Sequence, residues 1–178
     1  MSFNLTKKYP NLLEIMHLTP EQRMASLRRI FKRDIEENAD FKFRRTQIYP
    51  IKADGIADME REFMHLTTER VEEMDETGNT IKRNVFEPNR SMRLHWIKHH
   101  IQEDTPENIV VFSISERNKE KRQDIIKTYI YDKVEKYIIV LECHRGKGYY
   151  LLTAYHLDRS YAEKQIAKKM KHALPEVH

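Results

Sequence analysis

Apolar residues recur at helical spacing over the first forty residues of the chain. Thr19 stands before Pro20, and Gln22 follows three residues after Thr19. This is the pattern of a capped helix start with proline in the first turn. The apolar residues that follow are three or four positions apart, namely Met24, Leu27, Phe31 and Ile35. The spacing predicts a helical N-terminal region over residues 1–40.

Beyond residue 40 the pattern changes to short extended runs. Phe41, Phe43 and Thr46–Ile51 are predicted to be extended. A turn cluster at residues 75–79 separates two longer runs, Glu62–Met74 and Thr80–Phe86. Two such runs around a turn rich in Asp, Gly and Asn predict a hairpin.

The rest of the chain alternates helix and strand signals. One helix is predicted over Pro88–Glu103, and a last helix over residues 161–173 with Ser160 as its cap. Between them the apolar runs predict strands at Asn108–Ser115, Thr128–Asp132, Lys136–Glu142 and Gly148–Leu157. This order predicts an α+β fold, in which a helix packs on an antiparallel sheet of four or five strands. Residues 41–178 form the main domain in this interpretation.

Composition narrows the functional classes. The net charge of +4 and the pI of about 9.0 favour an anionic partner. No run of about 18 apolar residues is present, so no membrane span is expected. Cys143 is the only cysteine, which excludes an internal disulfide and fits a reducing cytoplasm. Neither a phosphate-binding glycine loop nor a zinc motif occurs, so no cofactor and no metal are expected.

The most informative segment is the strand run that ends at Tyr155. Side chains alternate across a strand, so Thr153 and Tyr155 are expected to share a face with Leu151 and Tyr149. A hydroxyl and a phenol at the end of a buried strand are poor core residues. They fit an active site, although by themselves they are better explained as a cross-strand pair.

The helix predicted over Pro88–Glu103 carries a second group of candidates. At 100° per residue, Arg90, Arg93 and His100 fall on or beside its apolar arc. Charges near a buried face need partners, which are either carboxylates of the sheet or a bound anion. His95 and His99 fall on the opposite side, where a surface position is favoured over a metal site.

A third candidate is His65. If Phe63–Thr68 is a strand, His65 and Thr67 share one of its faces. A histidine and a threonine placed in this way can bind phosphate or position a base. The polar side of a half-exposed strand looks the same in sequence.

These segments together resemble a known superfamily. His65–Thr68, Arg93–Ile97, Tyr129–Asp132, Tyr137–Leu141 and Gly148–Tyr155 occur in an order similar to that of the phage-associated branch of the barnase–EndoU–colicin–RelE-like (BECR) nucleases. The resemblance covers about residues 60–157, and its strongest part is the run Leu151–Tyr155. It implies a small α+β fold with a helix packed on an antiparallel sheet, and metal-independent cleavage of RNA.

The resemblance implies attack of the ribose 2′-OH on the adjacent phosphate, with a base, an acid and cationic donors. His65 or His100 is suited to act as the base or the acid. Arg90 and Arg93 are suited to bind the phosphate. Thr153 and Tyr155 are suited to act as donors at the scissile group. The helical geometry favours His100 as the histidine of the site, whereas the matched segment contains His95.

The function expected on this basis is a ribonuclease of the toxin or defence type that acts in the cytoplasm. Its partners would be RNA, with tRNA as one target, and an inhibitor or antitoxin protein. The alternatives are a noncatalytic module of the same fold that binds nucleic acid or protein, and a phage accessory protein.

Overall fold

The structure is a computed structural model that describes residues 3–50, 52–53, 56–144 and 146–178. Side chains are described for the same residues except 52–57. Ile51, which was predicted to end an extended segment, lies outside the described residues.

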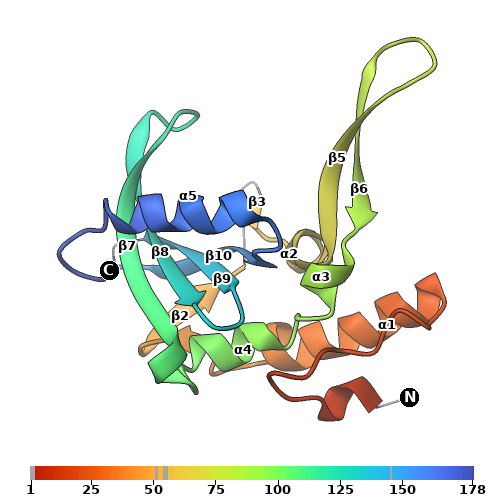
Figure 1. Cartoon of the computed structure of the whole chain (residues 1–178), viewed down its shortest axis with the longest axis horizontal. Coiled ribbons are helices and arrows are strands. Elements are labelled where there is room, and N and C mark those ends of the chain that lie inside the picture. Colours follow the sequence, from red (N-terminus) through yellow and green to blue (C-terminus); the bar gives the residue numbers. More distant parts are fainter. Residues whose placement is uncertain (1–2, 51, 54–55, 145) are drawn as a thin grey trace.

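A six-stranded sheet forms the centre of the molecule (Figure 1). In spatial order its strands are β1 (Lys42–Phe43), β2 (Thr46–Tyr49), β10 (Gly148–His156), β9 (Tyr137–His144), β8 (Gln123–Asp132) and β7 (Ile109–Asn118). Neighbouring strands are antiparallel except β2 and β10, which are parallel. The α+β prediction is therefore confirmed, with a larger sheet than the four or five strands expected.

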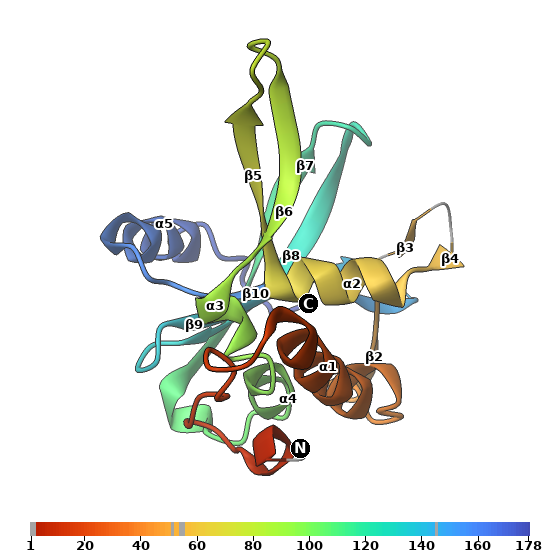
Figure 2. The ribbon, with the colours of Figure 1, turned by 90° about the vertical axis from the view of Figure 1, so that its right-hand side faces the viewer.

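Helices cover both faces of this sheet (Figures 1 and 2). On one face lie α1 (Pro20–Phe31), α2 (Met59–Thr67) and α4 (Trp96–Ile101), and their apolar residues pack with Ile130, Ile139 and Leu151 in what we call the main core. On the other face lies α5 (Ser160–Met170), where Ile166 packs with Phe112, Ile138 and Val140 in what we call the α5 core.

The N-terminal region belongs to the main core. Thr19 caps α1, and both hydrogen bonds of the predicted capping box with Gln22 are present. The helix continues as a π-helical turn over Lys32–Glu36. Leu27 and Ile30 are fully buried together with strand residues of the central sheet. Segments that were predicted separately thus share one hydrophobic interior.

The prediction of a strand from Glu62 is wrong, because residues up to Thr67 form α2. Asp58 caps this helix by accepting a hydrogen bond from the backbone N–H of Arg61. Met59, Phe63 and Leu66 then follow at helical spacing and pack into the main core. The cap and this spacing favour a helix, so His65 does not share a strand face with Thr67.

The hairpin itself is confirmed from β5 (Thr68–Met74) to β6 (Thr80–Phe86), which form a separate two-stranded sheet. A short pair, β3 (Lys52–Ala53) and β4 (Ile56–Ala57), forms another. The β5–β6 and β7–β8 hairpins project from the same side of the molecule (Figures 1 and 2). None of the helices in the described ranges is long and apolar enough to cross a membrane.

The single helix expected over Pro88–Glu103 is interrupted. It divides into α3 (Pro88–Ser91) and α4, and the turns between them are closed by hydrogen bonds between residues three apart, such as Leu94 N–H to the carbonyl of Ser91. A constant rotation of 100° per residue therefore does not hold across the break. As a result His95, predicted on the surface, is 5% exposed.

Strand β10 contains a bulge at Leu152. Leu151 is opposite Leu141 of β9, and Thr153 is opposite the next residue, Val140, so that Leu152 has no paired residue. The extra residue reverses the alternation of faces beyond it. Leu151 and Ala154 lie in the main core, whereas Tyr155 packs against the α5 core. The expectation that Tyr155 shares a face with Leu151 and Tyr149 is therefore wrong.

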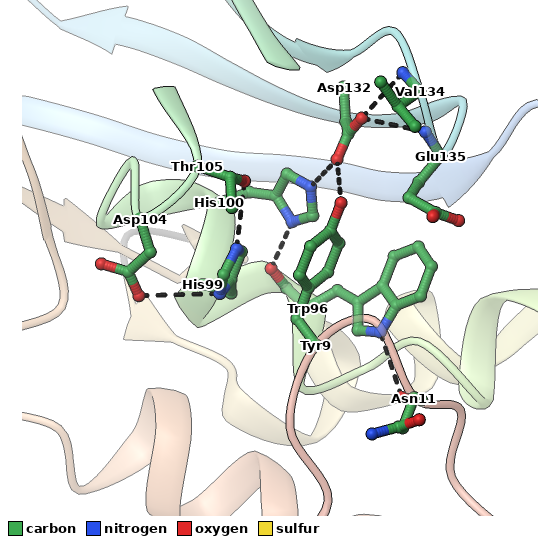
Figure 3. A network of polar contacts seen from close by, with 10 residues as sticks. All are labelled: Tyr9, Asn11, Trp96, His99, His100, Asp104, Thr105, Asp132, Val134 and Glu135. Atoms are coloured by element: carbon green, nitrogen blue, oxygen red, sulfur yellow. Dashed lines mark hydrogen bonds and ion pairs between the residues drawn. The ribbon is translucent and has the colours of Figure 1, made fainter. Parts of the chain in front are cut away.

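A buried polar network joins the N-terminal segment, α4 and β8 (Figure 3). His100 contacts the carboxylate of Asp132 through Nε2 at 2.8 Å and the carbonyl of Trp96 through Nδ1 at 2.7 Å. Both partners are acceptors, so both ring nitrogens carry protons and the pair is an imidazolium and a carboxylate. The phenol of Tyr9 donates to the same carboxylate oxygen at 2.8 Å.

Several hydrogen bonds stabilise the ionised form of Asp132. The backbone N–H groups of Val134 and Glu135 donate to its second oxygen. Although burial acts in the opposite direction, the hydrogen bonds from His100, Glu135 and Tyr9 lower the pKa of Asp132 to about 2. His100 and Asp132 are both fully buried, so removal of one charge leaves the other without compensation.

We expect Asp132→Asn to lower the free energy of unfolding by about 3 kcal/mol or more, because the His100 charge loses its partner. Chemical denaturation at pH 7 measures this change. The matched control is Asp124→Asn, which breaks an exposed ion pair with Arg117 and should cost less than about 1 kcal/mol. Equal losses of unfolding free energy in the two variants would contradict a buried ion pair between His100 and Asp132.

The same pair predicts a pH dependence. The pKa of Asp132 is lower in the folded chain than the unfolded value of ~3.9, so its stabilisation is complete above pH ~4. It is lost as the pH falls towards about 2. The wild-type protein should therefore lose stability more steeply than Asp132→Asn over this range.

Candidate functional site

The second half of β10 has an edge without a strand neighbour among the described residues. On this side, β2 pairs only with Tyr149 and Tyr150. Beyond these two residues, α2 and α3 lie against β10 in place of a strand. The edge is therefore covered by helices and is not paired with a strand.

A cleft of about 250 Å³ opens at this edge. It lies between the end of β10, the start of β5, α3 and one side of α5. Its lining is mainly polar, and comprises Glu69, Glu87, Asn89, Arg90, Tyr155, His156, Asp158, Arg159, Tyr161, Ala162, Gln165, Ile166 and Lys169. Two residues singled out from the sequence, Arg90 and Tyr155, therefore line the same cleft.

Hydrogen bonds hold both the backbone and the side chain of Arg90 in place. Glu87 caps α3 by accepting hydrogen bonds from the backbone N–H groups of Asn89 and Arg90. The guanidinium group of Arg90 donates to the carbonyls of His65 and Thr68. No carboxylate in the described part of the chain forms an ion pair with Arg90, and its buried Nε has no partner there. Arg90 therefore carries its charge beside the cleft without a carboxylate partner in the described part of the chain.

Arg93 lies next to His156. It donates a hydrogen bond to the carbonyl of Asn89 and packs over the ring of Trp96. Like Arg90, it has no ion pair within the described ranges, and its buried Nε has no partner there. Burial first, and then the charge of Arg93, lower the pKa of His156. His156 is therefore neutral near pH 7, and the described residues offer its Nδ1 no hydrogen-bond partner.

Tyr155 has the opposite protonation tendency. Burial raises its pKa, although the charges of Lys169 and Arg90 partly offset this effect. Its phenol therefore keeps its proton at neutral pH. A neutral imidazole can accept a proton and a protonated phenol can donate one, so these consecutive residues have the chemistry of a base and an acid.

The charge of the cleft is balanced overall. Its three basic side chains are Arg90, Arg159 and Lys169, and its three acidic ones are Glu69, Glu87 and Asp158. Two of these charges have other contacts, because Glu87 caps α3 and Lys169 pairs with Glu116 on β7. Attraction of an anion would thus depend on the position of Arg90 and Arg93 rather than on net charge.

His65 and Thr153 are near the cleft but do not line it. His65 hydrogen-bonds the backbone of Leu152 at the bulge and lies close to Arg90; its pKa is lowered mainly by burial. It thus satisfies a backbone group at the open edge of β10. Thr153 is half-buried next to the bulge.

His95 and His100 are separated from the cleft. His100 packs against Trp96 and Tyr137 of the main core, on the opposite face of the sheet from the Tyr155 ring. His95 contacts the carbonyl of Asn11 in the N-terminal segment. The structure therefore brings Arg90 and Tyr155 of the predicted residues into one cleft, and the charge of Arg93 acts on His156 there. It does not bring His95 or His100 to them.

The residue that sequence reasoning missed is His156. It follows Tyr155 directly, so the strand pattern places it on the opposite face. It reaches the same cleft because the strand ends there at an open edge. The sequence feature that points to His156 is its position next to Tyr155 at the end of an apolar strand.

Among the described residues, no group of three or more His, Cys, Asp or Glu side chains is placed to hold a metal ion. Comparison of the chain with protein-family models, with curated proteins and with solved structures found no match.

We expect Arg93→Leu to raise the pKa of His156 towards the ordinary value of ~6.5, because a neighbouring positive charge is removed. Asp158→Asn should lower it further, since the charge of Asp158 acts in the opposite direction. NMR titration of the His156 imidazole measures both shifts. Shifts of the same sign in the two variants would contradict the described environment.

Proposed function

We propose that this protein is an endoribonuclease that cleaves RNA through attack of the ribose 2′-OH, without a metal cofactor in the chemical step. The observation that supports this proposal best is the meeting of Arg90, Tyr155 and His156 in one cleft, with Arg93 beside His156. Neither arginine forms an ion pair with a carboxylate of the described chain. The cleft thus offers a base, an acid and cationic donors.

In the proposed reaction, neutral His156 removes the proton from the 2′-OH. The 2′ oxygen forms a bond to phosphorus while the bond from phosphorus to the 5′ oxygen breaks. The phenol of Tyr155 gives its proton to the leaving 5′ oxygen. The products are a 2′,3′-cyclic phosphate and a free 5′-OH. Arg90, with Arg93 behind it, stabilises the negative charge on the phosphoryl oxygens.

Substrate class and role belong to the same proposal. A reaction that uses the 2′-OH is restricted to RNA. The resemblance to BECR nucleases adds a toxin or defence role in the cytoplasm, with tRNA as one target and an inhibitor protein as a partner. These roles rest on the resemblance.

A noncatalytic module that binds nucleic acid is the second candidate. The observation that favours it is the positive charge of the whole chain, +4 with a pI of about 9.0, which attracts an anionic partner without requiring catalysis. Such a module would bind RNA through its surface and leave it intact.

We expect the purified protein to cleave single-stranded RNA in the presence of EDTA and to leave DNA of the same sequence intact. Tyr155→Phe should reduce kcat/KM at least about tenfold, and His156→Asn about a hundredfold, because each removes a proton-transfer group. The measurement is cleavage of an end-labelled oligonucleotide, with identification of the cyclic phosphate.

Matched controls are Tyr131→Phe, on β8 away from the cleft, and His17→Asn, an exposed histidine before α1. Both should retain wild-type rates. If RNA is bound but remains intact at high protein concentration, the enzyme proposal is wrong and the noncatalytic module is favoured.

The proposed base also predicts the pH profile. His156 acts in its neutral form, and its pKa is lowered from ~6.5, so kcat/KM should decrease only below pH ~6.5. Tyr155 acts in its protonated form, and its raised pKa places the alkaline decrease above pH ~10. An acidic midpoint above pH 7 would argue against His156 as the base.

A further inference from the structure

The outer side of α5 carries a row of basic residues that begins at the cleft. The inner side of this helix is marked by Ile166, which is buried in the α5 core. At 100° per residue, the side opposite Ile166 contains Tyr161, Lys164, Lys168 and Lys171, and all four are exposed. Lys171 is the C-cap and keeps helical backbone angles. We call these four residues the α5 stripe.

The lysines of the α5 stripe carry charges that no carboxylate of the described residues pairs with. Glu163, the one acidic residue of α5, forms an ion pair with Lys136 of the β8–β9 turn. Glu116 of β7 is likewise paired with lysines of its own surroundings. Asp158 and Glu176 lie before and after the helix, outside the stripe. The outer side of α5 is therefore positively charged along its length.

Tyr161 joins the α5 stripe to the cleft. Its ring lines the cleft and is 51% exposed. The guanidinium group of Arg159 donates a hydrogen bond to its hydroxyl at 3.0 Å. An exposed aromatic ring offers a face on which a nucleobase can stack. From Tyr161 the stripe follows α5, which lies across one face of the central sheet (Figure 1).

The length of the stripe suits a short stretch of nucleic acid. Tyr161 and Lys171 are ten residues apart, which is about 15 Å along a helix axis. A stacked strand rises ~3.4 Å per nucleotide, so roughly four nucleotides match this length. The lysines follow one another at about one helical turn. Successive phosphates of one strand can therefore each meet a lysine.

We propose that the α5 stripe binds the RNA strand where it leaves the cleft. One nucleobase stacks on Tyr161, and the phosphates that follow are bound by Lys164, Lys168 and Lys171. This inference rests on the proposed function, because it extends the path of the same substrate beyond the scissile phosphate. Lysines alone would suit any polyanion, whereas the tyrosine at the start of the row requires a base.

The binding test uses a labelled RNA hexanucleotide with 2′-O-methyl groups, which lacks the attacking hydroxyl and stays intact. The triple variant Lys164→Gln, Lys168→Gln and Lys171→Gln should weaken its binding at least about tenfold, because three phosphate contacts are lost. The slope of log Kd against log salt should decrease by about 2, since each contact to a single strand contributes ~0.7. Glutamine keeps the helix propensity of lysine. Fluorescence anisotropy at several KCl concentrations measures both effects.

The matched control removes the same charge elsewhere. Lys8, Lys98 and Lys147 lie outside α5 and also form no ion pair within the described ranges. Their triple substitution by Gln should leave the affinity and the salt slope as in the wild type. If both triple variants weaken binding equally, net charge alone explains the affinity and the proposal is overturned.

The tyrosine is tested separately. Tyr161→Phe keeps the ring and should bind the hexanucleotide as the wild type does, whereas Tyr161→Ala should weaken binding about tenfold. An abasic hexanucleotide should bind equally to the wild type and to Tyr161→Ala. Unchanged binding of the complete hexanucleotide in Tyr161→Ala would overturn the stacking contact. Hexaglutamate that binds as tightly as the RNA would assign the stripe to acidic peptides and also overturn the proposal.

Cleavage separates this inference from the proposed function. If the wild type cleaves RNA, the triple lysine variant should lose at least about ten times more kcat/KM on a hexanucleotide than on a dinucleotide, through KM. Equal losses on both substrates would overturn the stripe and leave the cleavage proposal standing. If the wild type binds the hexanucleotide through these residues but cleaves no RNA, the cleavage proposal fails and the binding surface is supported.

Discussion

The geometry of the candidate cleft depends on how β10 ends. The strand is paired with β9 at every residue except Leu152, but β2 pairs with its other side at only two residues. The bulge at Leu152 then directs Tyr155 to the α5 face while Ala154 stays in the main core. An open edge and a reversed face together allow the consecutive residues Tyr155 and His156 to reach one cleft.

The histidines of the chain show how burial assigns different roles to one residue type. His100 is an imidazolium paired with Asp132 in the centre of the fold, where it joins α4 to the sheet and to Tyr9. His95, five residues earlier, is neutral because of burial and contacts the carbonyl of Asn11. His156 is neutral through burial and the charge of Arg93. Only the last of these lies with the arginines and the tyrosine that fit phosphate chemistry.

Part of the candidate site could be predicted from the sequence. Arg90, Arg93 and Tyr155 were recognisable because each is a polar residue beside an otherwise apolar pattern. Two placements differed from those expected. The break between α3 and α4 changed the face of His95, and the bulge in β10 changed the face of Tyr155. Both irregularities depend on backbone contacts with other segments, which local periodicity does not reveal.

The sequence by itself determined the α+β class, the capped start of α1, the β5–β6 hairpin and the order of the last three strands and α5. These features follow from local spacing, capping residues and turn residues. Only the tertiary structure decided which residues share a site, which histidine is charged and where the cleft lies. Those properties depend on interactions between residues distant in sequence, such as the hydrogen bond of Tyr9 to Asp132 and the effect of the Arg93 charge on His156.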